Sequence, residues 1–112
     1  MKKIIIIAVL VFLVKTNHSF GQNPGTQLAN HIANKMRDTL GLTVGQRNQV
    51  FATNMLIHNR KMIVRQHTSN PDSLRSGLQR EERKRDSLYQ RILPAAKYQL
   101  YLQKKTSLVS SN

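Results

Sequence analysis

The sequence contains no cysteine and no tryptophan, and its aromatic residues are three tyrosines and three phenylalanines. Without cysteine, no disulfide bond can stabilise the fold. A chain of 112 residues with so few large aromatic side chains has little material for a deep core, because small domains bury a smaller fraction of their surface. Long helices that dimerise bury apolar surface more economically, so we expect an elongated homodimer.

Acidic residues are also scarce, with five Asp and Glu against eighteen Lys and Arg. Four of the five lie in residues 72–86, where helix capping and ion pairing account for them. Glu81 and Arg85 have the four-residue spacing of a favourable helical ion pair. The sequence shows no nucleophile–base constellation, glycine-rich phosphate loop or metal-binding motif. We therefore expect neither enzymatic activity nor a cofactor.

Three histidines follow the N-terminal region, and these are His31, His58 and His67. His58 and His67 are nine residues apart, whereas two metal ligands on one helical face are three or four residues apart. A zinc site within one chain is therefore not expected. A site between subunits that uses the same histidine from two chains stays open.

The N-terminus has the features of a signal peptide. Residues 2–3 are both lysine, and the apolar run over residues 4–14 is too short for an ordinary membrane span. Residues 19–21, Ser-Phe-Gly, then place small side chains at the −3 and −1 positions of a cleavage site. We predict that residues 1–21 are a cleaved signal peptide and that the protein is periplasmic, with secretion as an alternative. Lys15 is the one feature that favours a retained anchor.

The formal net charge of +13 at pH 7 falls to +10 when the three lysines of the signal peptide are removed. Most of the remaining excess lies in residues 42–69 and 87–112, each with a net charge of +4. Such a field attracts acidic proteins and anionic lipid headgroups. Nucleic acid is not expected as a partner, because an exported protein rarely meets it. Weak contact with an anionic membrane surface stays open.

Hydrophobic periodicity predicts an all-α protein with four helices in a single domain over residues 22–105. The helices are predicted over residues 26–40, 44–68, 71–93 and 94–105, followed by a flexible tail over residues 106–112. Gly41 is typical of a helix end, and Asn70 with Pro71 is typical of a helix start.

The predicted central helix carries apolar residues around most of its circumference. At 100° per residue they form three stripes, which are Val50, Ile57 and Val64; Phe51, Met55 and Met62; and Leu56 and Ile63. The polar sector holds Asn54, His58, Lys61 and Arg65. An ordinary surface helix has one apolar stripe, so this helix is either covered on several sides or offers apolar surface to a partner. Which stripe forms the core stays open.

The central segment also lacks acidic residues between Gly41 and Asn70. Its four cations, Arg47, Arg60, Lys61 and Arg65, are therefore predicted to have no compensating charge. A positive apolar rod of this kind could attract an acidic, unfolding chain over a distance and then hold it by loose apolar contacts.

Two related segments lie at predicted helix starts. Leu42 precedes Thr43 and Gln46, which have the spacing of a capping box, in which each side chain bonds the backbone N–H of the other residue. The second segment begins at Leu93 and Pro94, but lysine replaces the glutamine, so its capping box is lost. We expect both segments to act as helix starts.

With the signal peptide and the helix pattern, these two motif copies resemble the Spy/CpxP family of LTxxQ-motif periplasmic proteins, over residues 40–102. The resemblance implies a long, bent helical hairpin that dimerises into a thin, curved cradle. It also implies an ATP-independent envelope chaperone that holds unfolding proteins, while other members inhibit stress sensors or bind zinc. On this hypothesis adhesion to clients comes from Phe51, Met55, Met62 and Ile63, and attraction comes from Arg60, Lys61 and Arg65.

Two other functions remain open. The first is a regulatory binding module that recognises one folded stress-sensor domain. The second is a structural or membrane-surface protein that uses basic amphipathic helices on anionic lipid.

Overall fold

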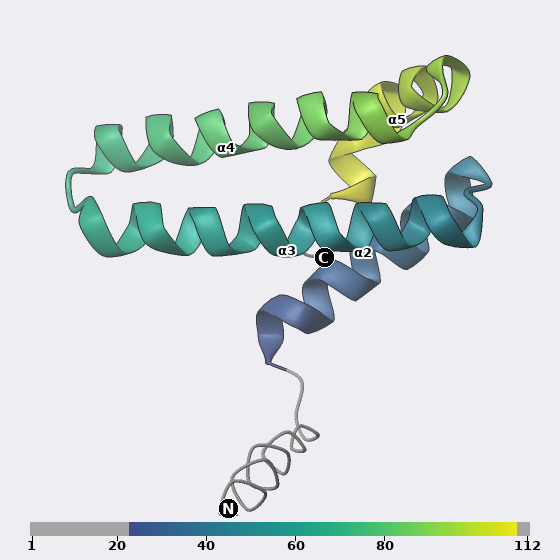
Figure 1. The fold of residues 1–112 in the computed structure, drawn as a ribbon. Helices are drawn as coiled ribbons and strands as arrows, with labels where there is room; N and C mark the ends of the chain where they lie inside the picture. Colours follow the sequence, from purple (N-terminus) through teal and green to yellow (C-terminus); the bar gives the residue numbers. More distant parts are fainter. Residues whose placement is uncertain (1–22, 110–112) are drawn as a thin grey trace, which may run out of the picture.

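The computed structural model describes residues 23–109, which form four helices and no strand (Figure 1). The helices are α2 (Pro24–Leu40), α3 (Val44–His67), α4 (Pro71–Ile92) and α5 (Ala95–Leu108). The all-α prediction with four helices is therefore confirmed, and the predicted helix limits agree with the structure to within a few residues. The predicted signal peptide, residues 1–21, lies outside the described residues.

Local side-chain chemistry sets the ends of the first and third of these helices. The Asn23 side chain accepts a hydrogen bond from the Thr26 backbone N–H at 2.8 Å at the start of α2. Gly41 ends α2 with φ of 70°, in the left-handed region that favours glycine. At the start of α4, the Asn70 side chain accepts from the backbone of Asp72 and Ser73.

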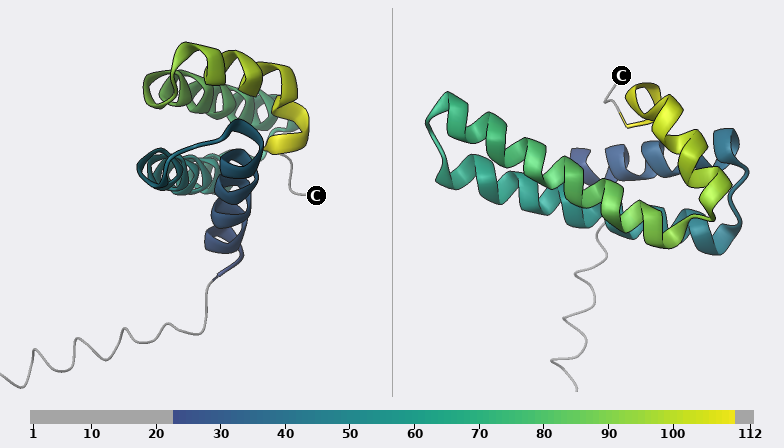
Figure 2. Two further views of the ribbon diagram at one scale, coloured as in Figure 1. Left: turned by 90° about the vertical axis from the view of Figure 1, so that its right-hand side faces the viewer. Right: turned by 90° about the horizontal axis from the view of Figure 1, so that it is seen from above.

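Helices α3 and α4 lie side by side as an antiparallel hairpin, and α2 and α5 pack near its open end (Figures 1 and 2). Helix α2 crosses against α3, and α5 contacts both α2 and α4. The turn that joins α3 to α4 extends beyond the other two helices. The hairpin is therefore supported by other helices at one end only.

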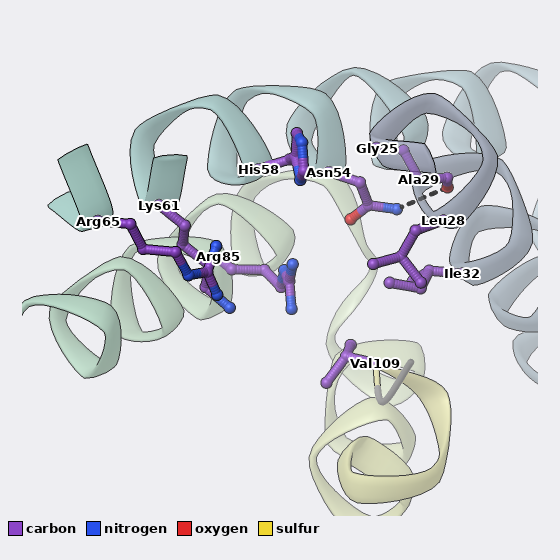
Figure 3. Close-up of a pocket in the computed structure, with 10 residues that line it drawn as sticks. All are labelled: Gly25, Leu28, Ala29, Ile32, Asn54, His58, Lys61, Arg65, Arg85 and Val109. Carbon is purple, nitrogen blue, oxygen red and sulfur yellow. Dashed lines mark hydrogen bonds between the residues drawn. The ribbon is translucent and has the colours of Figure 1, made fainter. Parts of the chain in front are cut away.

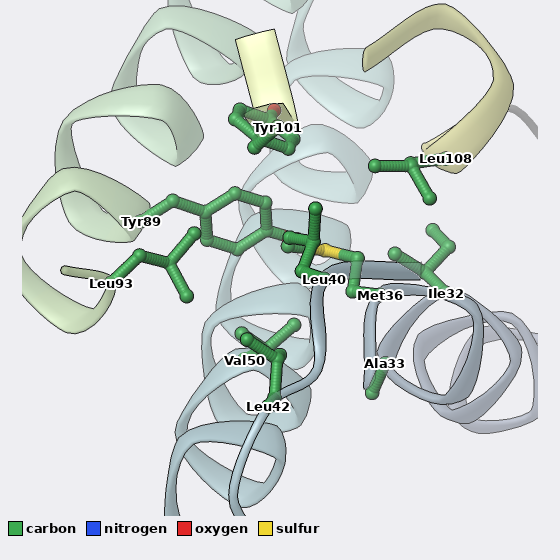
Figure 4. Close-up of a cluster of buried hydrophobic side chains, with 10 residues drawn as sticks. All are labelled: Ile32, Ala33, Met36, Leu40, Leu42, Val50, Tyr89, Leu93, Tyr101 and Leu108. Carbon is green, nitrogen blue, oxygen red and sulfur yellow. The ribbon is translucent and has the colours of Figure 1, made fainter. Parts of the chain in front are cut away.

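The hydrophobic core lies at this supported end, where all four helices contribute side chains (Figure 4). Its buried members are Ile32, Ala33, Met36, Leu40, Leu42, Val50, Tyr89, Leu93, Tyr101 and Leu108. The rings of Tyr89 and Tyr101 meet edge to face, with centroids 4.9 Å apart. The core therefore joins the first and last helices to the open end of the hairpin.

The end of the last helix differs from the predicted domain limit at residue 105. Helix α5 continues to Leu108, and the Leu108 side chain is buried in the core. This burial explains why the chain stays helical beyond the predicted limit. Within residues 23–109, no helix combines the length and the apolarity that a membrane span requires.

Candidate functional site

The capping box at the start of α3 is present as predicted. The Thr43 hydroxyl accepts from the Gln46 backbone N–H, and the Gln46 side-chain carbonyl accepts from the Thr43 backbone N–H, both at 3.0 Å. Leu42, which precedes this pair, is buried in the core. The segment therefore fixes where α3 begins and anchors that start to the rest of the protein.

The second motif copy has the same structural position at the start of α5. Leu93 is buried, as Leu42 is, and Pro94 occupies the N-cap position without a side-chain cap bond. Lys97, in the place of the glutamine, donates from Nζ to the Gly41 carbonyl at 2.5 Å. The lysine thus connects the start of α5 to the end of α2. This contact was not predictable from the sequence, because the two residues are 56 positions apart.

The structure shows which stripe of α3 forms the core. Val50 and Ile57 are fully buried, and Val64 in the same stripe is half-buried. Phe51 is half-buried against the core, and the Arg47 guanidinium lies 5.6 Å from the centroid of its ring. Among the predicted client-binding residues, Phe51 is therefore largely a packing residue.

Four apolar side chains from the middle and second half of α3 lie outside the core. Leu56, Met62 and Ile63 are 44%, 41% and 56% exposed, and Met55 beside them is half-buried. At 100° per residue these four positions lie within an arc of about 120°. We refer to Met55, Leu56, Met62 and Ile63 as the outer apolar face. Only its Met55 and Met62 edge lies beside the start of α2.

A groove of about 380 Å³ runs along the edge of the outer apolar face. Met55 and Met62 line it on α3, and Pro24 and Gly25 line it at the start of α2. A Cβ atom at Gly25 would clash with the His58 imidazole, so the backbone of α2 lies directly against the His58 side chain there. Methionine side chains adapt their shape at low cost, so this groove suits loosely defined apolar partners.

The polar sector of α3 is partly covered by other helices: Asn54 is buried, His58 and Lys61 are half-buried, and Arg65 is exposed. Asn54 is buried, donates from Nδ2 to the Ala29 carbonyl at 3.1 Å, and accepts a hydrogen bond from the Tyr89 hydroxyl. Burial raises the pKa of Tyr89. Sequence periodicity missed this arrangement, because a polar sector on an amphipathic helix ordinarily marks its solvent side.

Two cations of α3 have carboxylate partners on α4, which corrects the prediction of uncompensated charge. Arg60 pairs with Glu81, and Lys61 pairs with Glu82. The hydrogen bond from Arg60 to Glu81, together with the negative charge there, raises the pKa of Arg60. The antiparallel hairpin places the acidic block of α4 beside the second half of α3, although 21 positions separate each pair.

The predicted ion pair between Glu81 and Arg85 within α4 is wrong, because Arg85 has a different partner. Arg85 donates from Nη1 to Glu82, three residues earlier, at 2.9 Å, rather than to Glu81. Glu81 is turned toward α3 and engaged by Arg60. Competition from the neighbouring helix therefore decides which carboxylate Arg85 contacts.

The described chain keeps a large excess of unpaired positive charge. Each of the five carboxylate side chains has a Lys or Arg partner. Nine cations within residues 23–109 have none, and they are Lys35, Arg47, Arg65, Arg80, Arg83, Lys84, Arg91, Lys97 and Lys104. Of the three cations predicted to attract clients, only Arg65 is in this set.

A cavity of about 330 Å³ lies between α2, α3 and α4, beside the end of α5 (Figure 3). Its lining residues are Gly25, Leu28, Ala29, Ile32, Asn54, His58, Lys61, Arg65, Arg85 and Val109. The polar sector of α3 thus forms one wall of this cavity, which is partly open to solvent at Arg65. Residues 23–109 hold no group of three or more histidine or carboxylate side chains placed to bind a metal ion.

Comparisons with protein-family models, with curated proteins and with solved structures found no match for this chain.

Proposed function

We propose that this protein is an exported, ATP-independent holding chaperone or envelope-stress protein that binds unfolded or acidic proteins on the outer apolar face of α3. The observation that supports this proposal is the exposure of Leu56, Met62 and Ile63 on one helical face. Contiguous exposed apolar surface on a small protein ordinarily marks a binding site. The adjoining groove extends this surface toward α2.

In this proposal the positive charge attracts the client first, and the outer apolar face then holds it. The nine unpaired cations attract an acidic, unfolding chain and speed the first encounter. The outer apolar face then holds apolar segments of the client through contacts that tolerate many sequences. Release requires no nucleotide, because folding of the client buries the groups that were being held.

The resemblance to the Spy/CpxP family extends the proposal to location and assembly. We propose that the protein acts in the periplasm as a cradle-like homodimer built on a bent helical hairpin. The α3–α4 hairpin, which has supporting helices at one end only, supports this idea. In such a dimer the outer apolar face would have to stay accessible to clients.

The direct test is suppression of aggregation when a chemically unfolded client is diluted into buffer without ATP. The wild-type protein should suppress light scattering at stoichiometric amounts. Ile63→Ser removes about 1 kcal/mol of apolar burial from the client complex, so about fivefold more protein should be needed. Circular dichroism checks that the variant stays folded.

Leu102→Ser is the matched control for that test. Leu102 is also an exposed apolar residue in a helix, at 40% exposure, but it lies on α5 away from the outer apolar face. This variant should protect the client as well as the wild type does. Equal effects of the two substitutions, or no protection by the wild type, would reject the proposal.

The two alternative functions give different results in companion measurements. A regulatory module would bind one folded sensor domain and would not protect unrelated unfolded chains. A membrane-surface protein would sediment with anionic liposomes, and salt would reverse that binding.

A further inference from the structure

The cavity between α2, α3 and α4 has a cationic side and an apolar side. Lys61 and Arg65 from α3 and Arg85 from α4 form the cationic side (Figure 3). Leu28 and Ile32 from α2 lie on the opposite side. Cavities that bind small molecules commonly combine apolar walls with a few convergent polar groups.

The side chain of Arg85 is incompletely satisfied in this cavity. Arg85 is 5% exposed, and its Nη1 donates to the two carboxylate oxygens of Glu82 at 2.9 and 3.2 Å. Its Nε–H is the one buried side-chain nitrogen or oxygen within residues 23–109 that has no hydrogen-bond partner. Buried donors are almost always paired in folded proteins. An oxyanion in the cavity would supply the acceptor that this N–H lacks.

The charge balance around the cavity also favours an anion. Lys61 and Arg85 share a single carboxylate, Glu82. Arg65 has no carboxylate partner. Three cations therefore line the cavity beside one carboxylate. The charges of Lys61 and Arg85 are largely buried, and buried charge is best stabilised by a compensating charge nearby.

We propose that this cavity binds a small amphiphilic anion, which is a carboxylate or phosphate monoester carried on an apolar chain. The oxyanion accepts hydrogen bonds from Arg85 Nε and from Arg65, and the apolar chain lies against Leu28 and Ile32. Arginine suits this role because its planar guanidinium binds such groups through two parallel hydrogen bonds. None of the four residues of the outer apolar face lines this cavity, although the cavity shares Gly25 and His58 with the groove beside that face. The proposal does not depend on chaperone activity.

Isothermal titration of the purified protein with octanoate, below its micelle concentration, tests this site. Saturable binding of one octanoate per chain is the expected result. Arg65→Gln should weaken the affinity about tenfold, because it removes one charged hydrogen bond to the anion. Arg65 is an exposed residue without an ion-pair partner, so this substitution should leave the fold intact.

Arg83→Gln provides the control for charge alone. Arg83 is exposed on α4, has no ion-pair partner and does not line the cavity. It changes the net charge by the same amount, and octanoate should bind as tightly as to the wild type. Equal weakening by the two substitutions would show non-specific attraction and would overturn the proposal.

Octyl phosphate and inorganic phosphate test the anionic group and the apolar chain of the ligand separately. Octyl phosphate and octanoate distinguish a phosphate from a carboxylate as the preferred group, and tight binding of either supports the site. Inorganic phosphate lacks the apolar chain and should bind at least about tenfold more weakly. The assignment would be overturned if inorganic phosphate bound as tightly as the octyl compounds, or if neither octyl compound bound saturably.

Discussion

At the residue scale, Tyr101 connects the hydrophobic core to the carboxylate of Asp86. Its ring is fully buried, and its hydroxyl donates to Asp86 Oδ1 at 2.8 Å. Asp86 in turn pairs with Lys105. Burial raises the pKa of Tyr101, and the hydrogen bond to the Asp86 carboxylate raises it further. The hydroxyl therefore stays protonated in the folded protein at pH values where an exposed tyrosine ionises.

This pKa shift predicts a loss of stability in alkaline solution. Above pH 10 the unfolded chain releases the Tyr101 proton while the folded chain keeps it, so the free energy of unfolding falls as pH rises. Each such tyrosine contributes a slope of up to about 1.4 kcal/mol per pH unit. Tyr101→Phe should make the decline above pH 10 shallower by up to that amount in urea unfolding followed by circular dichroism.

The neutral range supplies the internal control for this comparison. Between pH 7 and 9 the Tyr101 hydroxyl is protonated in both the folded and the unfolded chain. The free energies of unfolding of wild type and Tyr101→Phe should therefore show parallel pH dependence there. Parallel curves above pH 10 as well would contradict the account of Tyr101.

Residue-scale contacts differ in how far the sequence predicts them. The capping box of Thr43 and Gln46 was predictable, because both partners lie within one turn of the same helix. The pair of Arg60 and Glu81 was not, because it depends on the register between α3 and α4. Contacts within one helical turn can be predicted from residue spacing. Contacts between α3 and α4 can be predicted only when the packing of the two helices is known.

At the scale of elements, the close approach of α3 and α4 depends on Gly77. A Cβ atom at Gly77 would lie 2.8 Å from Cγ1 of Val64. Valine has restricted side-chain freedom in a helix, so Val64 cannot move aside without displacing the helix. Gly77 therefore allows a contact that any larger residue would obstruct.

Gly77→Ala should destabilise the protein although alanine is the better helix former. Overpacking costs about 1–3 kcal/mol, whereas the gain in helix propensity is about 1 kcal/mol. We expect a net loss of about 1 kcal/mol in the free energy of unfolding, measured by urea titration.

Gly45→Ala is the matched control for Gly77→Ala. Gly45 is also helical, but it is exposed, and its nearest neighbouring atom, the Thr43 hydroxyl oxygen, would lie 3.9 Å from the added Cβ. This substitution should stabilise the protein by about 0.5 kcal/mol. If Gly77→Ala stabilised the protein as much as Gly45→Ala does, the close-approach argument would fail.

The limits of the helices were predictable, but the orientation of α3 was not. Gly41, Asn70 and Pro71 mark helix ends through local backbone preferences. The three apolar stripes of α3 give relative angles only, and they do not say which stripe meets α2 and α4. The buried position of Asn54 depends on Tyr89 and the Ala29 carbonyl, which lie on other helices.

At the scale of the whole molecule, the core and the candidate binding surface are separated. The core holds the four helices together at the open end of the hairpin. The outer apolar face lies on the second half of α3, outside that core. The fold can therefore remain intact while this surface contacts a partner.

Features of the whole molecule differ in how far the sequence predicts them. The surplus of apolar surface and of positive charge was visible from composition and periodicity. The cationic cavity was not, because its walls come from three helices. Arg65 lines that cavity, and Arg60 and Lys61 are paired with Glu81 and Glu82. In the proposed function, attraction would therefore come mainly from cations other than the three first predicted.

The most direct test of the central claim places a photo-crosslinking amino acid at position 63 in one variant and at position 102 in another. Each variant is illuminated with a chemically unfolded client and no ATP. Because Ile63 lies on the outer apolar face and Leu102 does not, crosslinks to the client should form from position 63 and be nearly absent from position 102. Equal crosslinking from both positions, or crosslinks from position 63 to a second copy of the chain instead of the client, would contradict the account.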